Sequence, residues 1–156
     1  MRHTIILCFL FLAGCDESID YRHGGYLSSF SFNNFDPLHP DIIDPYYEDG
    51  LFEINWELRD IRHDTLVTVT LLVGDHRKII LQDAFYHVDD PTRLRGNSAF
   101  LFDHESRLFE ILPDGELRYV ANLSGYDIYS RSSIIAIEAC EYSAECHYSE
   151  IPVYFW

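Results

Sequence analysis

Five carboxylates lie close together in a short, proline-rich segment of the chain, residues 33–50. Carboxylate oxygens are ligands that calcium prefers, and the ion takes about six to eight oxygens at about 2.3–2.6 Å. Three prolines stiffen the segment, although the spacing of its acids matches no EF-hand. The competing interpretation, which the sequence favours, is a solvated, rigid connector packed by Phe35, Ile42 and Ile43. The residues of this candidate ligand or calcium site are Asp36, Asp41, Asp44, Glu48 and Asp49.

Two tyrosines, Tyr46 and Tyr47, stand beside these carboxylates. Their aromatic rings could stack on a sugar or contact a peptide. Tyrosine is also common in β-sheets, where it packs against the neighbouring strand. Packing is the more common role of strand tyrosines, and stacking on a ligand is the alternative.

The chain starts with a basic residue and a short apolar run. Arg2 precedes apolar residues that end at Leu12-Ala13-Gly14-Cys15. The run is shorter than the roughly 20 residues of a membrane-spanning helix, so we predict a secretory signal instead. Its last four residues resemble the lipobox of bacterial lipoproteins. That resemblance implies cleavage before Cys15, addition of a diacylglyceryl group to its sulfur and acylation of the new amine, which together anchor the chain firmly in a membrane.

Two acids, Asp16 and Glu17, follow the predicted lipidation site. In enteric-type bacteria, acids at these positions resemble a signal for staying in the inner membrane. We therefore expect an inner-membrane anchor, with the protein facing the periplasm. The predicted organisation is a signal peptide over 1–14, a lipidated tether over 15–25 and a single domain over 26–156.

Cys140 and Cys146 remain when Cys8 leaves with the signal and Cys15 carries lipid. In an oxidising compartment, such an even pair predicts a disulfide. The alternative is a metal site that also uses a histidine such as His147. No second cysteine pair or His-x₃-His cluster accompanies the pair in the sequence, so we predict the disulfide.

The sequence contains no motif of nucleophilic or cofactor chemistry. It lacks a Gly-x-Ser-x-Gly elbow, Ser-x-x-Lys, His-Glu-x-x-His and a phosphate-binding glycine loop. Its eight histidines are scattered along the chain. We therefore predict a protein that is not an enzyme and has no cofactor.

The composition is strongly acidic. The chain has 26 acidic and 11 basic residues, a formal net charge of −15. Such a field repels nucleic acid and anionic lipid headgroups and favours cationic partners, although acidity can also serve only to keep an exported protein soluble. Hydrophobic residues make up 47% of the chain, which predicts a folded domain with a core.

Apolar and polar residues alternate along much of the chain, which is the period of a half-buried strand. A Pro-Asp-Gly turn at 113–115 predicts a hairpin. Pro152 cannot donate a hydrogen bond, so the last strand is expected to lie at an edge or carry a bulge. The predicted strands are 51–60, 65–73, 77–85, a hairpin over 107–123, 133–140 and 147–155.

Seven or eight short strands joined by turns predict an all-β fold, an antiparallel β-sandwich. Trp56, which ends "FEINW", resembles the early-strand tryptophan of fibronectin type III and related immunoglobulin-like domains. The segments "IAIEACEYSAEC" and "YSEIPVYF" resemble the last two strands of those domains. The resemblance covers about residues 50–155 and implies an immunoglobulin-like arrangement, with core positions at Ile135, Ile137 and Ala139.

These observations predict a lipid-anchored binding module that faces the periplasm and binds a protein in the cell envelope, because sandwich edges and loops make good docking surfaces. One alternative is an inhibitor or immunity-type lipoprotein whose acidic face blocks a cationic enzyme. Another is a glycan-binding module with calcium dependence. We expect no nucleic acid partner.

Overall fold

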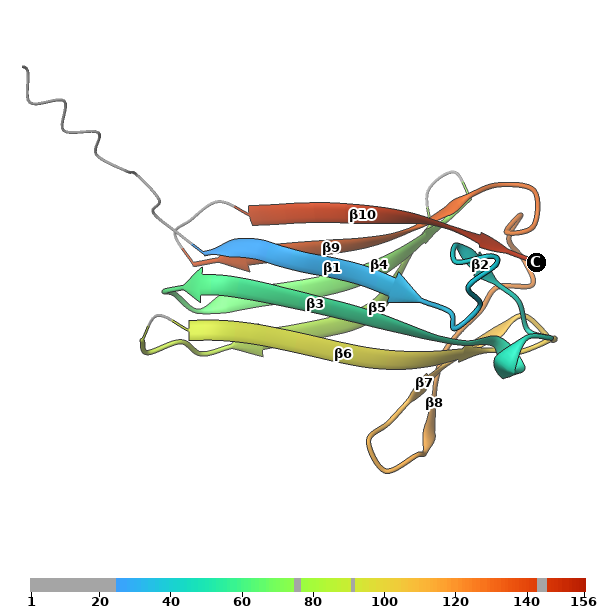
Figure 1. Ribbon diagram of the computed structural model, residues 1–156, viewed down its shortest axis with the longest axis horizontal. Coiled ribbons are helices and arrows are strands. Elements are labelled where there is room, and N and C mark those ends of the chain that lie inside the picture. Colours follow the sequence, from blue (N-terminus) through green and yellow to red (C-terminus); the bar gives the residue numbers. More distant parts are fainter. Residues whose placement is uncertain (1–24, 75–76, 91, 143–145) are drawn as a thin grey trace, which may run out of the picture.

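A computed structural model describes residues 25–74, 77–90, 92–142 and 146–156 (Figure 1). The predicted signal, Cys15 and the tether before residue 25 lie outside these ranges. No helix within them is long and apolar enough to cross a membrane. The elements are β1 (Tyr26–Asn33), β2 (Ile42–Ile43), the 3₁₀ turn η1 (Glu48–Gly50), β3 (Leu51–Ile61), β4 (Thr65–Val73), β5 (Arg77–Tyr86), β6 (Thr92–Phe102), β7 (Arg107–Ile111), β8 (Leu117–Asn122), β9 (Ser133–Glu141) and β10 (Cys146–Phe155).

The strands form two five-stranded sheets, with the orders β1-β3-β6-β7-β8 and β2-β10-β9-β4-β5. Their inner faces share one hydrophobic core. Phe52 of β3 stacks on Phe100 of β6 within the first sheet, with ring centroids 5.3 Å apart. Phe102 of β6 meets Phe155 of β10 across the two sheets at 4.8 Å. The alternating pattern thus places every second side chain in this shared interior.

The strand order is that of an immunoglobulin-like sandwich. β1, β3 and β6 take the places of strands A, B and E, and β4, β9 and β10 those of C, F and G, with β5 beside β4. The predicted all-β, immunoglobulin-like sandwich is therefore confirmed. The hairpin β7–β8 extends the first sheet beyond β6 and projects from the body of the molecule (Figure 1).

The predicted strands are present, with small changes at their ends. β4 covers the predicted residues, while β3, β5, β9 and β10 each extend slightly beyond them. β10 pairs with β9 along Cys146–Val153, whereas β2 reaches only Tyr154 and Phe155. Pro152 therefore lies where β10 is an edge strand, as predicted.

The described part of the chain forms ten strands, so the expectation of seven or eight was too low. β1 carries a bulge between Leu27 and Ser29, which shifts the phase of its alternation. The inward side of β6 includes Gly96, which faces Trp56, and Ser98, which faces Ile54. These small residues interrupt the apolar pattern, and the strand was missed for that reason.

Candidate functional site

The segment between β1 and β3 crosses one end of the sandwich and is fixed there by the end of β10. The backbone N–H of Tyr154 donates to the carbonyl of Asp41 at 2.9 Å, and the N–H of Trp156 donates to the carbonyl of Ile43 at 3.0 Å. Ile43 and Phe155 are buried, at 1% and 4% exposure. The loop and the C-terminus therefore form one continuous surface over the core.

Asn34 holds the first half of this loop in shape. Its Nδ2 donates to the carbonyl of His39 at 2.7 Å and also to the carbonyl of Ile42. Its Oδ1 accepts from the N–H of Asp36 at 3.1 Å. Because the side chain is nearly buried, both ends of its amide need these partners, and the loop is tied to them.

The second half of the loop closes through η1, in left-handed backbone. Glu48, Asp49 and Gly50 have φ values of 46°, 55° and 72°. A Cβ on Gly50 would lie 2.0 Å from the carbonyl oxygen of Phe102, so only glycine fits against β6 here. The tight turn places the two acids at the same end of the molecule as the C-terminus.

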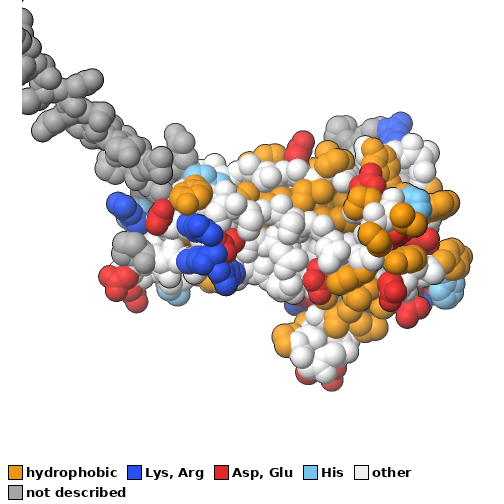
Figure 2. Space-filling model, in the orientation of Figure 1, with side chains coloured by type: hydrophobic (Ala, Val, Ile, Leu, Met, Phe, Trp, Pro, Cys, Tyr) orange, Lys and Arg blue, Asp and Glu red, His pale blue; other side chains and the backbone are white. Residues whose placement is uncertain are grey.

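This end exposes large apolar side chains. Leu38, Tyr46 and Trp156 are 81%, 84% and 65% exposed. The ring of His39 meets Trp156 edge to face at 6.0 Å, which links the loop to the C-terminus. Figure 2 shows hydrophobic side chains gathered at this end, with acidic ones among them. We call this the end surface; its exposed apolar members are Phe35, Leu38, Tyr46, Tyr47, Tyr154 and Trp156.

All five predicted carboxylates lie in this loop. Asp36 accepts from the N–H of Leu38 at 2.9 Å and lies 3.0 Å from Nδ1 of His39. The hydrogen bond with His39, followed by that from Leu38, lowers the pKa of Asp36. Asp44 accepts from the N–H of Tyr46 at 2.8 Å. Both carboxylates thus shape the turns that carry the exposed apolar side chains.

The loop does not gather these carboxylates into one cluster. Among the described residues, no three of them bring ligand oxygens within 4.8 Å of one another. The remaining three carboxylates lie elsewhere in the loop. Asp41 stands just before β2, and Glu48 and Asp49 belong to η1. Calcium binding here stays a prediction, and the arrangement fits an acidic, exposed docking surface more directly.

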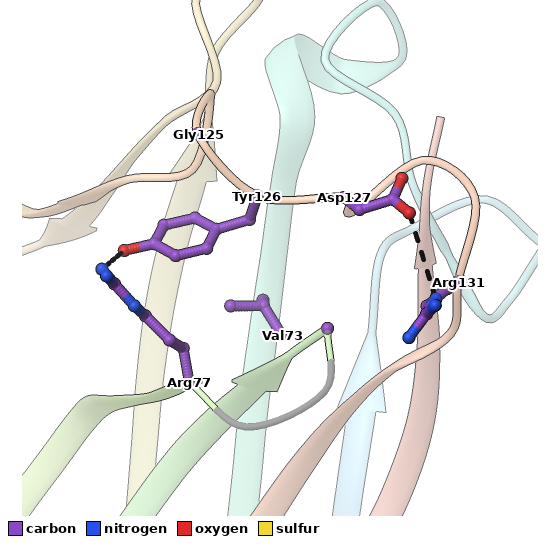
Figure 3. A pocket seen from close by; sticks show the side chains of 7 residues that line it. Val73, Arg77, Gly125, Tyr126, Asp127 and Arg131 are labelled. Atoms are coloured by element: carbon purple, nitrogen blue, oxygen red, sulfur yellow. Dashed lines mark hydrogen bonds and ion pairs between the residues drawn. The ribbon is translucent and has the colours of Figure 1, made fainter.

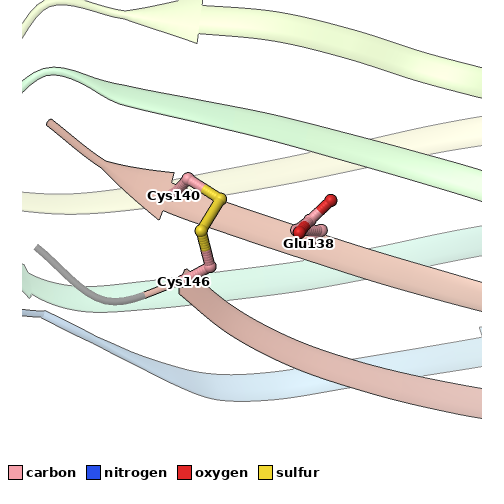
Figure 4. Close-up of side chains that lie close together, drawn as sticks. All are labelled: Glu138, Cys140 and Cys146. Atoms are coloured by element: carbon pink, nitrogen blue, oxygen red, sulfur yellow. A yellow bond between two sulfur atoms is a disulfide. The ribbon is translucent and has the colours of Figure 1, made fainter.

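The predicted disulfide between Cys140 and Cys146 is confirmed, with an S–S distance of 2.04 Å. The two cysteines face each other in the β9–β10 pair, with Glu138 close by (Figure 4). Metal binding by cysteine needs thiolates, and bonded sulfurs do not supply them. The pair therefore closes the β9–β10 connection and is not a metal centre in this state.

A shallow hollow of about 280 Å³ lies between the β4–β5 turn and the loop before β9. The guanidinium of Arg77 lies 4.8 Å from the ring centre of Tyr126 and donates to its hydroxyl. Arg131 lies 3.9 Å from Asp127 (Figure 3). Both cationic groups at this hollow are thus engaged by neighbouring side chains.

A cluster of arginines surrounds Glu57 on the outer face of the first sheet. Oε1 of Glu57 accepts from Nε of Arg59 at 2.5 Å, and Oε2 accepts from Nε of Arg95 at 2.9 Å and from Arg93. Ser28 donates to Oε1 at 2.9 Å. The hydrogen bonds from Arg93 and Arg59 lower the pKa of Glu57 from 4.5 to about 2, so the carboxylate is ionised at neutral pH.

Sequence reasoning missed the arginine cluster and the hollow. Arg93 and Arg95 lie 36 and 38 residues from Glu57, and the pairing of β3 with β6 brings them together. Arg77 lies 49 residues from Tyr126, and it meets this tyrosine only because the loop before β9 packs against the start of β5. No protein-family model matches the chain, and no curated protein matches it.

Proposed function

We propose that the chain is a lipid-anchored, periplasm-facing, non-catalytic module that binds a basic protein of the cell envelope through its end surface. The observation that carries this proposal is the exposure of Leu38 and Tyr46 on a loop with five carboxylates, beside the exposed Trp156 of the C-terminus. Aromatic anchors in the middle of an interface supply most of its binding energy, and charged groups around them select the partner.

Charge supports a cationic partner. The formal net charge of −15 creates a field that attracts basic surfaces and repels acidic ones. The end surface adds a local source of this field, because its carboxylates stand next to the apolar side chains. We therefore expect association to weaken steeply as salt is raised.

The placement of the end surface suits a tethered binder. β1 starts at the end of the sandwich opposite to the C-terminus (Figure 1). The tether predicted from the sequence leads into β1, so an anchored domain would present the end surface away from the membrane. Ile43 and Phe155 hold the surface on the core, so little order would have to be gained on binding.

Cross-linking in cells, followed by capture and mass spectrometry, tests this proposal. Tyr46→Ala combined with Trp156→Ala should lose the dominant protein partner of the unaltered chain. Truncation of a central aromatic costs about 2 kcal/mol or more, about thirtyfold in affinity. Tyr142→Ala is the matched control, because Tyr142 is 77% exposed and lies outside the end surface.

The partner should be a basic protein, and the purified pair should separate at high salt. An undiminished complex with the double variant would refute the assignment of the end surface. A captured partner that is an enzyme inhibited by the complex would favour the inhibitor alternative. Loss of binding on chelation would favour the calcium-dependent glycan alternative.

A further inference from the structure

The arginine cluster is an exception to the acidic character of the chain. Arg59, Arg93 and Arg95 are three of only 11 basic residues in the whole sequence. All three hydrogen-bond to Glu57, and Asp60 lies beside Arg59 and Arg93 in an adjoining shallow hollow. The three arginines, Glu57 and Asp60 therefore carry a combined formal charge of +1, in a chain whose formal net charge is −15.

The arginines remain open to a further anion. Their side chains are 48%, 46% and 61% exposed, whereas the side chain of Glu57 is only 12% exposed. Each guanidinium has five N–H donors, and Glu57 accepts from one on each. The buried carboxylate of Glu57 thus holds the three guanidinium groups side by side. Figure 2 shows a group of basic side chains on this face, near the end of the sandwich at which β1 begins.

The cluster lies at the end of the sandwich where the described chain begins. Tyr26, the first residue of β1, pairs directly with Arg59. Nine residues lie between Cys15 and Gly25. The ten Cα–Cα steps between these two residues span at most about 36 Å when fully extended. An anchor at Cys15 would therefore keep this cluster near the membrane surface.

We propose that Arg59, Arg93 and Arg95 bind the phosphate groups of anionic phospholipids in the membrane that holds the anchor. This inference rests on the lipid anchor of the proposed function and adds a contact that orients the domain. Guanidinium groups pair with phosphate oxygens through two parallel hydrogen bonds. An anionic leaflet attracts the basic cluster and repels the acidic end surface, so both forces turn the end surface outward.

Arginine modification in vesicles tests this contact. The lipidated full chain is placed in vesicles of phosphatidylcholine alone or of equal parts phosphatidylcholine and phosphatidylglycerol. Phenylglyoxal then labels arginines, and peptide mass spectrometry reads each site. We expect labelling of the cluster to slow by about fivefold in the anionic vesicles, the attraction expected for one arginine at such a surface. High salt should abolish the difference.

Arg118 is the internal control. It pairs with Glu110, and its side chain is 60% exposed, almost the same as Arg95 beside Glu57. It lies in β8, on the projecting hairpin, and its labelling should be equal in both kinds of vesicle. A second test uses Arg93→Gln with Arg95→Gln, both of them exposed substitutions. In this variant the protection of Arg59 should disappear, while thermal unfolding still shows a folded domain.

The possible outcomes test the phospholipid contact and the lipid anchor at Cys15 separately. Equal labelling of the cluster in both vesicles would overturn the contact and leave the anchor intact. Equal protection by inorganic phosphate, added to the protein in detergent, would also overturn it and make the cluster a site for small anions. The same digest reports the mass of the Cys15 peptide. A bare Cys15 would refute the anchor, whatever the arginines show.

Discussion

Gly96 makes room for the buried indole of Trp56. The two residues face each other in the β3–β6 pair. A Cβ on Gly96 would lie 2.3 Å from Cε2 and Nε1 of the indole. Trp56 is 2% exposed, its Nε1 donates to Oε1 of Gln82 at 3.1 Å, and Tyr86 meets the ring edge to face at 5.8 Å. The indole is therefore confined, and Gly96→Ala should force a shift in it or in β6.

The expected cost follows from two opposing effects. Inserting a methyl group into a packed core costs about 1–3 kcal/mol. Alanine regains about 0.5–1 kcal/mol relative to glycine inside a strand. We therefore expect Gly96→Ala to lower the free energy of unfolding by about 1–2 kcal/mol, with a larger loss if the Trp56–Gln82 hydrogen bond breaks.

Urea unfolding followed by far-ultraviolet circular dichroism measures this loss. Gly125→Ala is the matched control, because a Cβ on Gly125 would have no atom within 4 Å. In addition, Trp56→Phe should relieve the clash, so the double variant should be more stable than the two single losses predict when added. If Gly96→Ala were as stable as Gly125→Ala, the proposed confinement of the indole would be refuted.

Three further predictions concern the Cys140–Cys146 disulfide, the arginine cluster and the loop between β1 and β3. Replacing both Cys140 and Cys146 by alanine should lower the free energy of unfolding by about 2–2.5 kcal/mol, as measured in urea, because a short closed loop is lost from the unfolded chain. Glu57 has its pKa lowered to about 2 in the folded protein, so it contributes stability above its unfolded pKa of about 4.5 that is lost as the pH falls toward 2. Glu57→Gln should remove this part of the acid dependence in unfolding curves measured across that range; an unchanged dependence would count against the cluster. Asn34→Ala should cost about 1–3 kcal/mol in the same assay, because two carbonyls lose a buried donor. It should also weaken partner capture, whereas a stable variant that still binds would show that Asn34 does not shape the end surface.

Local pattern explains why the sequence predicts the sandwich. The alternation of Phe52, Ile54, Trp56 and Leu58 shows which face of β3 is buried, since successive side chains of a strand point to opposite faces. The position of the last strand at an edge of its sheet follows from Pro152, which has no backbone N–H to donate. The bridge between Cys140 and Cys146 follows from their short separation and the expected oxidising compartment.

Strand pairing decides which functional side chains lie close together. It joins residues that are far apart in the chain. The sequence marks 33–50 as acidic and apolar, but only the pairing of β2 with β10 adds Trp156 to the loop. Glu57 and Arg95 become neighbours because β3 and β6 pair in that register, and a shift by one residue would send one of them into the core. The sequence by itself thus determined the all-β class, the main strands and the bridge, because these depend on local periodicity and spacing. Only the tertiary structure decided the end surface and the arginine cluster, because register between distant strands is set by how the whole core packs.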